Sequence, residues 1–115
     1  MREKITIIGA GNLTLSILEG MAKSEGLYNI DVVDIDKKKA SILKRFNVGF
    51  DYQYSSNISK SNIIMLVTKP KDYVKVIKSI NPYISDHSII LSFIAGIKIR
   101  QIQDELTHKI RVIRC

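Results

Sequence analysis

KITIIGAGNLT, at residues 4–14, is the stretch that most strongly indicates how this chain folds. Residues 4–8 form a short β-branched run, which is typical of a buried strand. Glycines end this run at positions 9 and 11, and apolar residues recur at helical spacing from Asn12 onward. The stretch therefore predicts a strand, a tight turn and a helix, an order of elements in which a glycine-rich turn can hold a phosphate group.

The rest of the chain repeats this alternation of strand and helix. Apolar runs predict further strands at residues 30–33, 62–68, 88–94 and 109–113, with a short extended piece around 48–52. Helical spacing predicts helices from Asn12 to about Gly26 and over 37–46, 70–80 and 99–106, with one helical turn within 55–61. Because residues 62–68 are apolar without alternation, we expect that strand to be covered on both faces. The pattern predicts a three-layer α/β fold with a mostly parallel, doubly wound sheet.

Size and composition favour one ordinary globular domain. The chain has 115 residues, of which 45% are hydrophobic and 25% charged, so we expect a single domain over residues 1–115. Lysine and arginine outnumber aspartate and glutamate by 18 to 11, and the formal charge of +7 raises the question of a nucleic-acid or membrane partner. The basic residues are scattered as on solvated helix faces, and the aromatic residues show no stacking pattern. We therefore expect neither partner.

The single cysteine, Cys115, excludes an intrachain disulfide and a cysteine-based metal cluster. A reducing compartment fits best, and the apolar run at residues 5–8 is too short for a signal peptide or a membrane span. We therefore expect a cytoplasmic protein without a metal site. His87 and His108 are expected to be surface residues rather than catalysts or metal ligands.

The glycines at positions 9 and 11 predict a site for the pyrophosphate of a dinucleotide. Gly9 allows the tight turn, and Gly11 allows the backbone to approach the anion. The helix that follows directs its N-terminal N–H groups and the positive end of its dipole at the same place. The alternative interpretation is that the two glycines only form a turn between a strand and a helix.

An acidic residue about twenty positions further along often binds the adenosine ribose hydroxyls, and Asp34 stands there, at the end of the second predicted strand. This favours NAD over NADP. Asp36 competes for the same role, or it caps the helix that follows. The basic run 37–39 could instead accept the 2′-phosphate of NADP, so the sequence leaves both NAD and NADP open.

The segment 67–70 (VTKP) follows the predicted central strand, at the place where open α/β sheets bind the reactive end of a ligand. Its backbone is expected to line the nicotinamide side of the site. In the alternative interpretation, Lys69 is a solvated loop lysine and Pro70 only begins the next helix.

Four blocks of the sequence resemble, in order and spacing, the pyrroline-5-carboxylate reductases. The blocks are 7–13 (IIGAGNL), 67–70 (VTKP), 92–97 (SFIAGI) and 111–114 (RVIR), and together they span nearly the whole chain. The resemblance implies that the first block binds the cofactor pyrophosphate through Gly9, Ala10, Gly11, Asn12 and Leu13. It also implies that Val67, Thr68, Lys69 and Pro70 border the nicotinamide, and that Ala95 and Gly96 shape the same pocket near the substrate.

The same resemblance implies the NAD(P)H-dependent reduction of 1-pyrroline-5-carboxylate, a cyclic imine, to L-proline. In this family a helical dimerisation domain follows the position of Arg114 and completes the substrate pocket. We therefore expect residues 1–115 to be the NAD(P)-binding Rossmann domain without that second domain, incomplete for catalysis alone, and we assign no catalytic residue. The C-terminal edge at residues 110–115 is expected to be apolar and to favour a homo-oligomer.

Three positions depart from the family pattern and leave alternatives open. Thr14 stands where a small residue is usual, Thr68 replaces a valine, and Tyr54 lies near the position of a cofactor-contacting asparagine. A non-catalytic dinucleotide-binding or interaction module is the main alternative function, because a fold does not settle an activity. Imine reductases and prephenate dehydrogenases also begin with a Gly-x-Gly turn, but the block at 92–97 argues against them.

Overall fold

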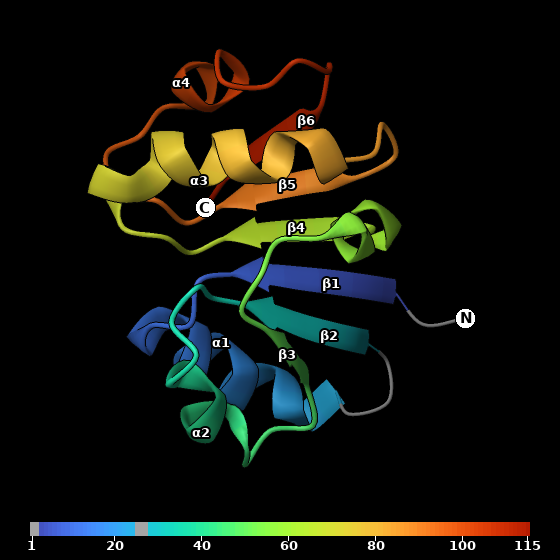
Figure 1. Cartoon of the computed structure of the whole chain (residues 1–115), viewed down its shortest axis with the longest axis vertical. Coiled ribbons are helices and arrows are strands. Elements are labelled where there is room, and N and C mark those ends of the chain that lie inside the picture. Colours follow the sequence, from blue (N-terminus) through green and yellow to red (C-terminus); the bar gives the residue numbers. More distant parts are fainter. Residues whose placement is uncertain (1–2, 25–27) are drawn as a thin grey trace.

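A six-stranded sheet forms the centre of the computed structural model, which describes residues 3–24 and 28–115. The strands are β1 (Glu3–Ile8), β2 (Tyr28–Val33), β3 (Gly49–Asp51), β4 (Ile63–Leu66), β5 (Ile89–Ser92) and β6 (Arg111–Arg114). They lie in the order β3-β2-β1-β4-β5-β6, and each of these neighbouring pairs is parallel (Figure 1). The predicted doubly wound α/β fold is therefore confirmed, with a sheet that is wholly parallel over the described residues.

Over residues 3–24 and 28–115, four α-helices and four short 3₁₀ segments connect the strands. The helices are α1 (Asn12–Met21), α2 (Lys39–Leu43), α3 (Tyr73–Ile80) and α4 (Ile99–Gln103). The 3₁₀ segments are η1 (Ala22–Ser24), η2 (Ser56–Lys60), η3 (Pro70–Asp72) and η4 (Asn81–Tyr83). The helix expected over 37–46 is shorter than predicted and covers only Lys39–Leu43, because the chain forms i→i+3 turns on either side of it, from the Lys39 N–H to the Asp36 carbonyl at 3.1 Å and from the Phe46 N–H to the Leu43 carbonyl at 3.0 Å. The predicted end of the first helix at Gly26 lies outside the described residues.

The two faces of the sheet are covered by different helices. On one face, Ile7 and Val32 of the sheet pack in a buried cluster with Leu18 of α1 and Leu43 of α2. On the other face, the buried cluster holds Ile64, Ile90 and Val112 of the sheet together with Ile77 of α3 and Ile102 of α4. Figure 1 shows α1 and α2 towards the β3 end of the sheet and α3 and α4 towards the β6 end. Strands that are apolar on both faces require these two layers, which is why the sequence contains continuous apolar runs.

The connection from β3 to β4 contains only the short segment η2, and polar residues lie on the sheet face beside it. Thr6 is buried there, and its hydroxyl lies 2.6 Å from the Ser61 hydroxyl. Its neighbour Asp31 forms an ion pair of 2.6 Å with Lys4. A polar group away from water needs such a partner, so these pairs compensate the polar residues on this part of the sheet.

The strand order determines where a ligand can bind. β1 lies between β2 and β4, so the chain leaves β1 towards one edge of the sheet and returns to fill the other half from β4. At such a switch point the loops after two neighbouring strands separate and leave a crevice at their carboxyl ends. Two backbone bonds hold these loops in place, from Val67 N–H to the Ile8 carbonyl at 2.9 Å and from Gly9 N–H to the Val33 carbonyl at 2.8 Å.

Candidate functional site

Gly9 makes the turn that ends β1, and only glycine fits its place. Its φ is +111°, in the left-handed region that side chains disfavour. A Cβ atom at this position would lie 2.8 Å from the carbonyl oxygen of Val67, which is closer than non-bonded atoms normally come. The backbone after β1 thus passes directly over the end of β4, as the sequence predicted for a tight turn.

Gly11 has a different environment from Gly9. It is the N-cap residue of α1, and a Cβ atom there would meet no described atom within 4 Å, so the space in front of the helix is open. No side chain caps the N-terminus of α1. The first N–H groups of a helix have no partner within the helix, and together with the helix dipole they form a favourable place for an anion.

Thr14 stands where glycine-rich turns of this kind often have a third glycine, and its side chain explains how the turn forms without one. Its side chain is fully buried, and its hydroxyl donates a hydrogen bond of 2.5 Å to the Gly9 carbonyl. The hydroxyl therefore links α1 to the end of β1, at the position where a glycine would otherwise allow close packing of helix and strand. The departure at Thr14 is compatible with the turn geometry.

Asp34 lies beside the glycine turn, and both of its carboxylate oxygens accept backbone hydrogen bonds. One oxygen accepts from the Ala10 N–H and the other from the Asp36 N–H, each at 2.9 Å. The side chain of Asp36 accepts from the Lys38 N–H, so Asp36 stabilises the turn before α2 and is not its cap, since the N-cap residue of α2 is Lys38. Through its two hydrogen bonds, Asp34 holds the loop after β2 against the turn after β1. In the same loop, Lys37 lies over the ring of Tyr52, at 4.6 Å from the ring centre.

A cavity of about 590 Å³ lies over the carboxyl ends of β1, β2 and β4. This volume is within the usual range for small-molecule sites, about 300–1,000 Å³. The predicted site residues that line it are Gly9, Ala10, Gly11, Asp34, Val67, Thr68 and Lys69. The other predicted site residues, Asn12, Leu13, Pro70, Ala95 and Gly96, are not among its lining residues. Ala95 and Gly96 lie in the exposed loop after β5. Strand β5 is the neighbour of β4 in the sheet, so this loop follows the strand beside β4.

Further residues of this cavity were not predicted from the sequence. The additional lining residues are Ile8, Val33, Ile35, Asp36, Lys39, Tyr54, Lys71, Asp72, Lys75, Val76 and Ser79. Of these, Tyr54 departs from the family pattern, and Asp36 and Lys39 belong to the segment that bears on the choice between NAD and NADP. A spacing of four residues from Lys71 to Lys75 and Ser79 places these three on one side of η3 and α3, and this periodicity is the signal that could have identified them.

The pKa of Tyr54, which lines this cavity, is shifted by its surroundings. The half-buried phenol has a pKa raised above its ordinary value of 10.0, first by burial and then by the negative charges of Asp34 and Asp72. The hydroxyl is therefore protonated at neutral pH and can donate a hydrogen bond. An aromatic ring with a polar end suits the wall of a nucleotide site.

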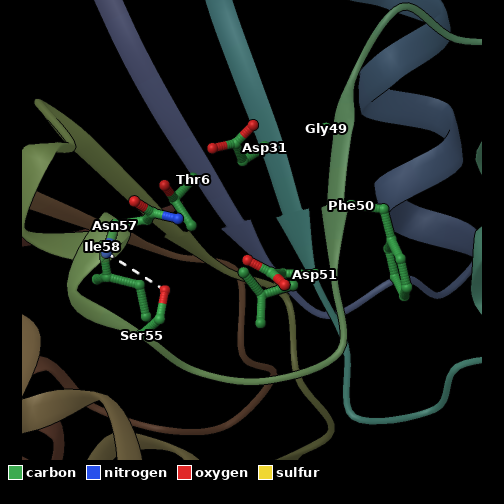
Figure 2. Close-up of a pocket in the computed structure, with 9 residues that line it drawn as sticks. Thr6, Asp31, Gly49, Phe50, Asp51, Ser55, Asn57 and Ile58 are labelled. Atoms are coloured by element: carbon green, nitrogen blue, oxygen red, sulfur yellow. Dashed lines mark hydrogen bonds between the residues drawn. The ribbon is translucent and has the colours of Figure 1, made fainter.

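A second, smaller cavity of about 180 Å³ lies between β2, β3 and η2 (Figure 2). Its polar lining includes Asp31, Asp51, Ser55 and Asn57. Asp31 is paired with Lys4, and the hydroxyl of Ser55 accepts the Asn57 N–H at 3.3 Å. In the described part of the chain, no group of three or more His, Cys, Asp or Glu residues is arranged to hold a metal ion. This cavity is too small for a dinucleotide, so the larger one is the candidate site.

His87 and His108 are both exposed, as expected; His87 lies near the Ser85 hydroxyl and His108 near Asp86. Among the residues that the structure describes, no helix has the length and apolar character needed to cross a membrane.

Comparison with known proteins agrees with this geometry. The model of the family described as NADP oxidoreductase, coenzyme F420-dependent, matches residues 4–96. The pyrroline-5-carboxylate reductase of Staphylococcus haemolyticus (strain JCSC1435) is 32% identical over 107 residues, which are 90% of this chain and 40% of that protein. The corresponding enzyme of Staphylococcus aureus (strain COL) is 29% identical over the same length and the same shares. The chain thus spans about 40% of the length of these curated relatives.

Solved structures show the same fold at low sequence identity. A pyrroline-5-carboxylate reductase from Coxiella burnetii superposes with a TM-score of 0.89 at 20% identity, over 99% of this chain and 43% of the other. A pyrroline carboxylate reductase from Plasmodium falciparum with NADP bound gives a TM-score of 0.79 at 16% identity, over 97% of this chain and 41% of the other.

Proposed function

Because the chain belongs to the family described as NADP oxidoreductase, coenzyme F420-dependent, we propose that it binds NAD or NADP in the cavity over β1, β2 and β4. We propose further that it is the coenzyme-binding part of an enzyme that reduces 1-pyrroline-5-carboxylate to L-proline. One observation carries this proposal: the glycine turn and the uncapped N-terminus of α1 open onto the cavity at the switch point of the sheet.

The turn after β1 would hold the pyrophosphate. The open space at Gly11 admits the phosphate groups, and the first N–H groups of α1, including those of Asn12 and Leu13, face an anion placed there. Ala10 would act indirectly, because its N–H is donated to Asp34 and holds the turn in shape. The residues of the turn would therefore fix the position of the cofactor along the edge of the sheet.

The loops after β4 and β5 would position the reactive end of the cofactor. Phe93 N–H donates to the Leu66 carbonyl at 2.9 Å and keeps the beginnings of these two loops side by side. In the proposed site, residues 67–70 and the pair Ala95 and Gly96 border the nicotinamide. The bound nicotinamide would supply the hydride, and this chain would supply its orientation and part of the pocket that shields it from water.

Binding of the imine and location in the cell are the parts of the proposal that go beyond the cofactor site. The chain spans about 40% of its relatives, so the groups that bind the imine are expected from the additional domain that such a protein would have. We also propose cytoplasmic location, supported by the single cysteine. The alternative of a dinucleotide-binding module without catalytic activity shares the cofactor site and differs only in the chemistry that follows binding.

A titration with NADH and NADPH, read by nicotinamide fluorescence, tests the cofactor site. The variant Gly11→Asp places a carboxylate at the proposed pyrophosphate position and should weaken binding of both dinucleotides at least about tenfold, through charge repulsion and loss of space. The matched control is Gly20→Asp, on an exposed glycine near the other end of α1 with no described atom near its Cβ. It should bind as the unmodified chain does.

Stability measurements separate loss of the site from loss of the fold. Aspartate is a favourable N-cap residue, so Gly11→Asp should unfold at the same temperature as the unmodified chain or slightly higher. Binding that is saturable in the unmodified chain, lost in Gly11→Asp and retained in Gly20→Asp would support the proposal. Equal binding by all three chains, or no binding by the unmodified chain, would refute it.

A further inference from the structure

We infer that Thr14 is a positioning residue for the proposed pyrophosphate site, and that its hydroxyl acts through the carbonyl of Gly9. The inference rests on the proposed function and deepens it, because it names a residue that sets the geometry of that site without touching the ligand. The ligand group concerned is the diphosphate anion that NADH and NADPH have in common. The hydroxyl should therefore affect both dinucleotides equally.

The sheet holds the turn at Gly9 in place from two sides. The Gly9 N–H donates a hydrogen bond of 2.8 Å to the carbonyl of Val33, at the end of β2. A Cβ atom on Gly9 would lie 2.8 Å from the carbonyl oxygen of Val67, so the turn also rests against the end of β4. These contacts fix the peptide of Gly9 relative to the strands, and neither of them reaches α1.

Thr14 provides a link from this turn to the helix. It is the third residue of α1, its side chain is fully buried, and its hydroxyl donates to the Gly9 carbonyl at 2.5 Å. The bond passes over the N-cap residue Gly11, since its two partners are five positions apart in the chain. A hydroxyl removed from water needs a partner, and this carbonyl supplies it. The first turn of α1 is thereby joined to a peptide that the sheet already holds.

The other buried contact of α1 lies one turn further along the helix. Thr14 and Leu18 are the buried residues of α1, and Leu18 packs in the apolar cluster with Ile7 and Val32. No side chain caps the N-terminus of α1. The contact of Thr14 therefore governs where the first turn lies relative to the sheet. Because the first N–H groups of a helix are the ones that can bind an anion, their direction depends on this contact.

The size of threonine explains why the hydroxyl is needed here. A glycine at this position of the turn allows helix and strand to pack closely against each other. The larger side chain of Thr14 lies between them, and its hydrogen bond replaces that direct contact. Loss of the hydroxyl would leave the helix start without this link. Since donors that are fixed before binding lose less freedom when the ligand arrives, a loosened first turn should bind the anion more weakly.

Dissociation constants for NADH and NADPH, measured on the full chain with Thr14→Ala and Thr14→Ser, test the inference. The two variants differ from each other by one hydroxyl. Thr14→Ala should weaken binding of both dinucleotides by the same factor, about three- to tenfold, which is the usual range for one hydrogen bond. Thr14→Ser keeps the donor and should bind within about twofold of the unmodified chain. Thr14→Val fills the space without a donor, and it should show the same loss if Thr14→Ala does not fold.

Leu18→Val is the matched control for stability. It makes the other buried residue of α1 smaller and leaves the Thr14 hydroxyl in place. It should lower the unfolding temperature, because a buried methylene is lost, and change both dissociation constants by less than about twofold. A loss of binding that follows stability alone would appear in this control as well.

The backbone amide NMR signals of Asn12 and Leu13, followed during addition of inorganic pyrophosphate, report on the helix start directly. They should shift in the unmodified chain and in Thr14→Ser, and should need a higher pyrophosphate concentration in Thr14→Ala. Unchanged binding by Thr14→Ala, a loss confined to one dinucleotide, or an equal loss in Thr14→Ser or Leu18→Val would overturn the inference and leave the proposed function standing. Failure of the unmodified chain to bind either dinucleotide would overturn both.

Discussion

At the scale of single residues, Gly9 determines the geometry of the candidate site. Its positive φ and the 2.8 Å separation between a Cβ atom and the Val67 carbonyl oxygen each exclude a side chain. The neighbouring Gly11 is open instead, so the two glycines have different functions. The sequence suggested this division of roles, but only the structure identifies the atom that a side chain at Gly9 would meet.

Replacement of Gly9 by alanine should destabilise the fold. Gly9→Ala combines an unfavourable backbone conformation with a steric clash, and we expect a loss of at least about 1–3 kcal/mol in the free energy of unfolding, measured by urea denaturation. Gly20→Ala is the control, because Gly20 lies in α1 with open space around it, and it should gain about 1 kcal/mol from helix propensity. Equal stability of Gly9→Ala and the unmodified chain would show that the turn is not constrained in this way.

At the scale of elements, strands were easier to predict than helices and site walls. The strands were found because continuous apolar runs reflect burial on two faces. The helix expected over 37–46 forms only at Lys39–Leu43, since backbone turns of the i→i+3 type replace the α-helical hydrogen bonds at both of its ends. The wall formed by η3 and α3 was missed because a lysine at helical spacing is usually a solvated residue, and its orientation towards a cavity depends on how the helix packs.

The segment between β3 and η2 provides Tyr54, whose titration tests the packing of this segment over the cavity. Folding raises the pKa of the Tyr54 phenol, through burial first and then through Asp34 and Asp72. Below pH about 10 the phenol is protonated in the folded and the unfolded chain, so its contribution to stability is fully present. At higher pH the unfolded chain loses the proton first, and this contribution is lost as the pH rises through the folded pKa.

An alkaline titration followed by tyrosinate absorbance measures this shift. The unmodified chain should show a component that titrates above the ordinary tyrosine range, and Tyr54→Phe should lack it. Stability at pH about 11 relative to pH 8 should also fall less in Tyr54→Phe. A titration curve whose highest component is unchanged in the variant would show that Tyr54 is solvated in solution.

At the scale of the whole molecule, the helical layer over one sheet face ends before the sheet does. One cross-strand row on that face runs through Ile7, Met65, Leu91 and Ile113. Ile7 is fully buried, Met65 is 8% exposed and Ile113 is 45% exposed. Of the apolar edge expected over 110–115, only Ile113 is an exposed apolar side chain, because Ile110 and Val112 are buried and the exposed neighbours Arg111 and Arg114 are charged. Association through this edge stays a prediction.

Light scattering at increasing protein concentration tests this prediction. We expect the unmodified chain to associate as concentration rises and Ile113→Glu to reduce that association, because a charge there would have to be desolvated. Ile42→Glu is the matched control, since Ile42 on α2 is 42% exposed and lies outside this row. A clean monomer at high concentration, or an equal effect of both substitutions, would contradict the prediction.

The sequence by itself determined the fold, the position of the glycine turn and the family resemblance, because each depends on local patterns: apolar periodicity, two glycines and four short blocks. The division of the longer relatives into this domain and a further helical one also comes from that resemblance and stays a prediction. Only the tertiary structure decided what Asp34 contacts and which lysines line the cavity. Hydrogen bonds and cavity walls bring together residues that are far apart in the chain, as the bond from the Ala10 N–H to Asp34 does. A local sequence pattern therefore does not show which of several acidic or basic side chains reaches a given N–H group or lines a given cavity.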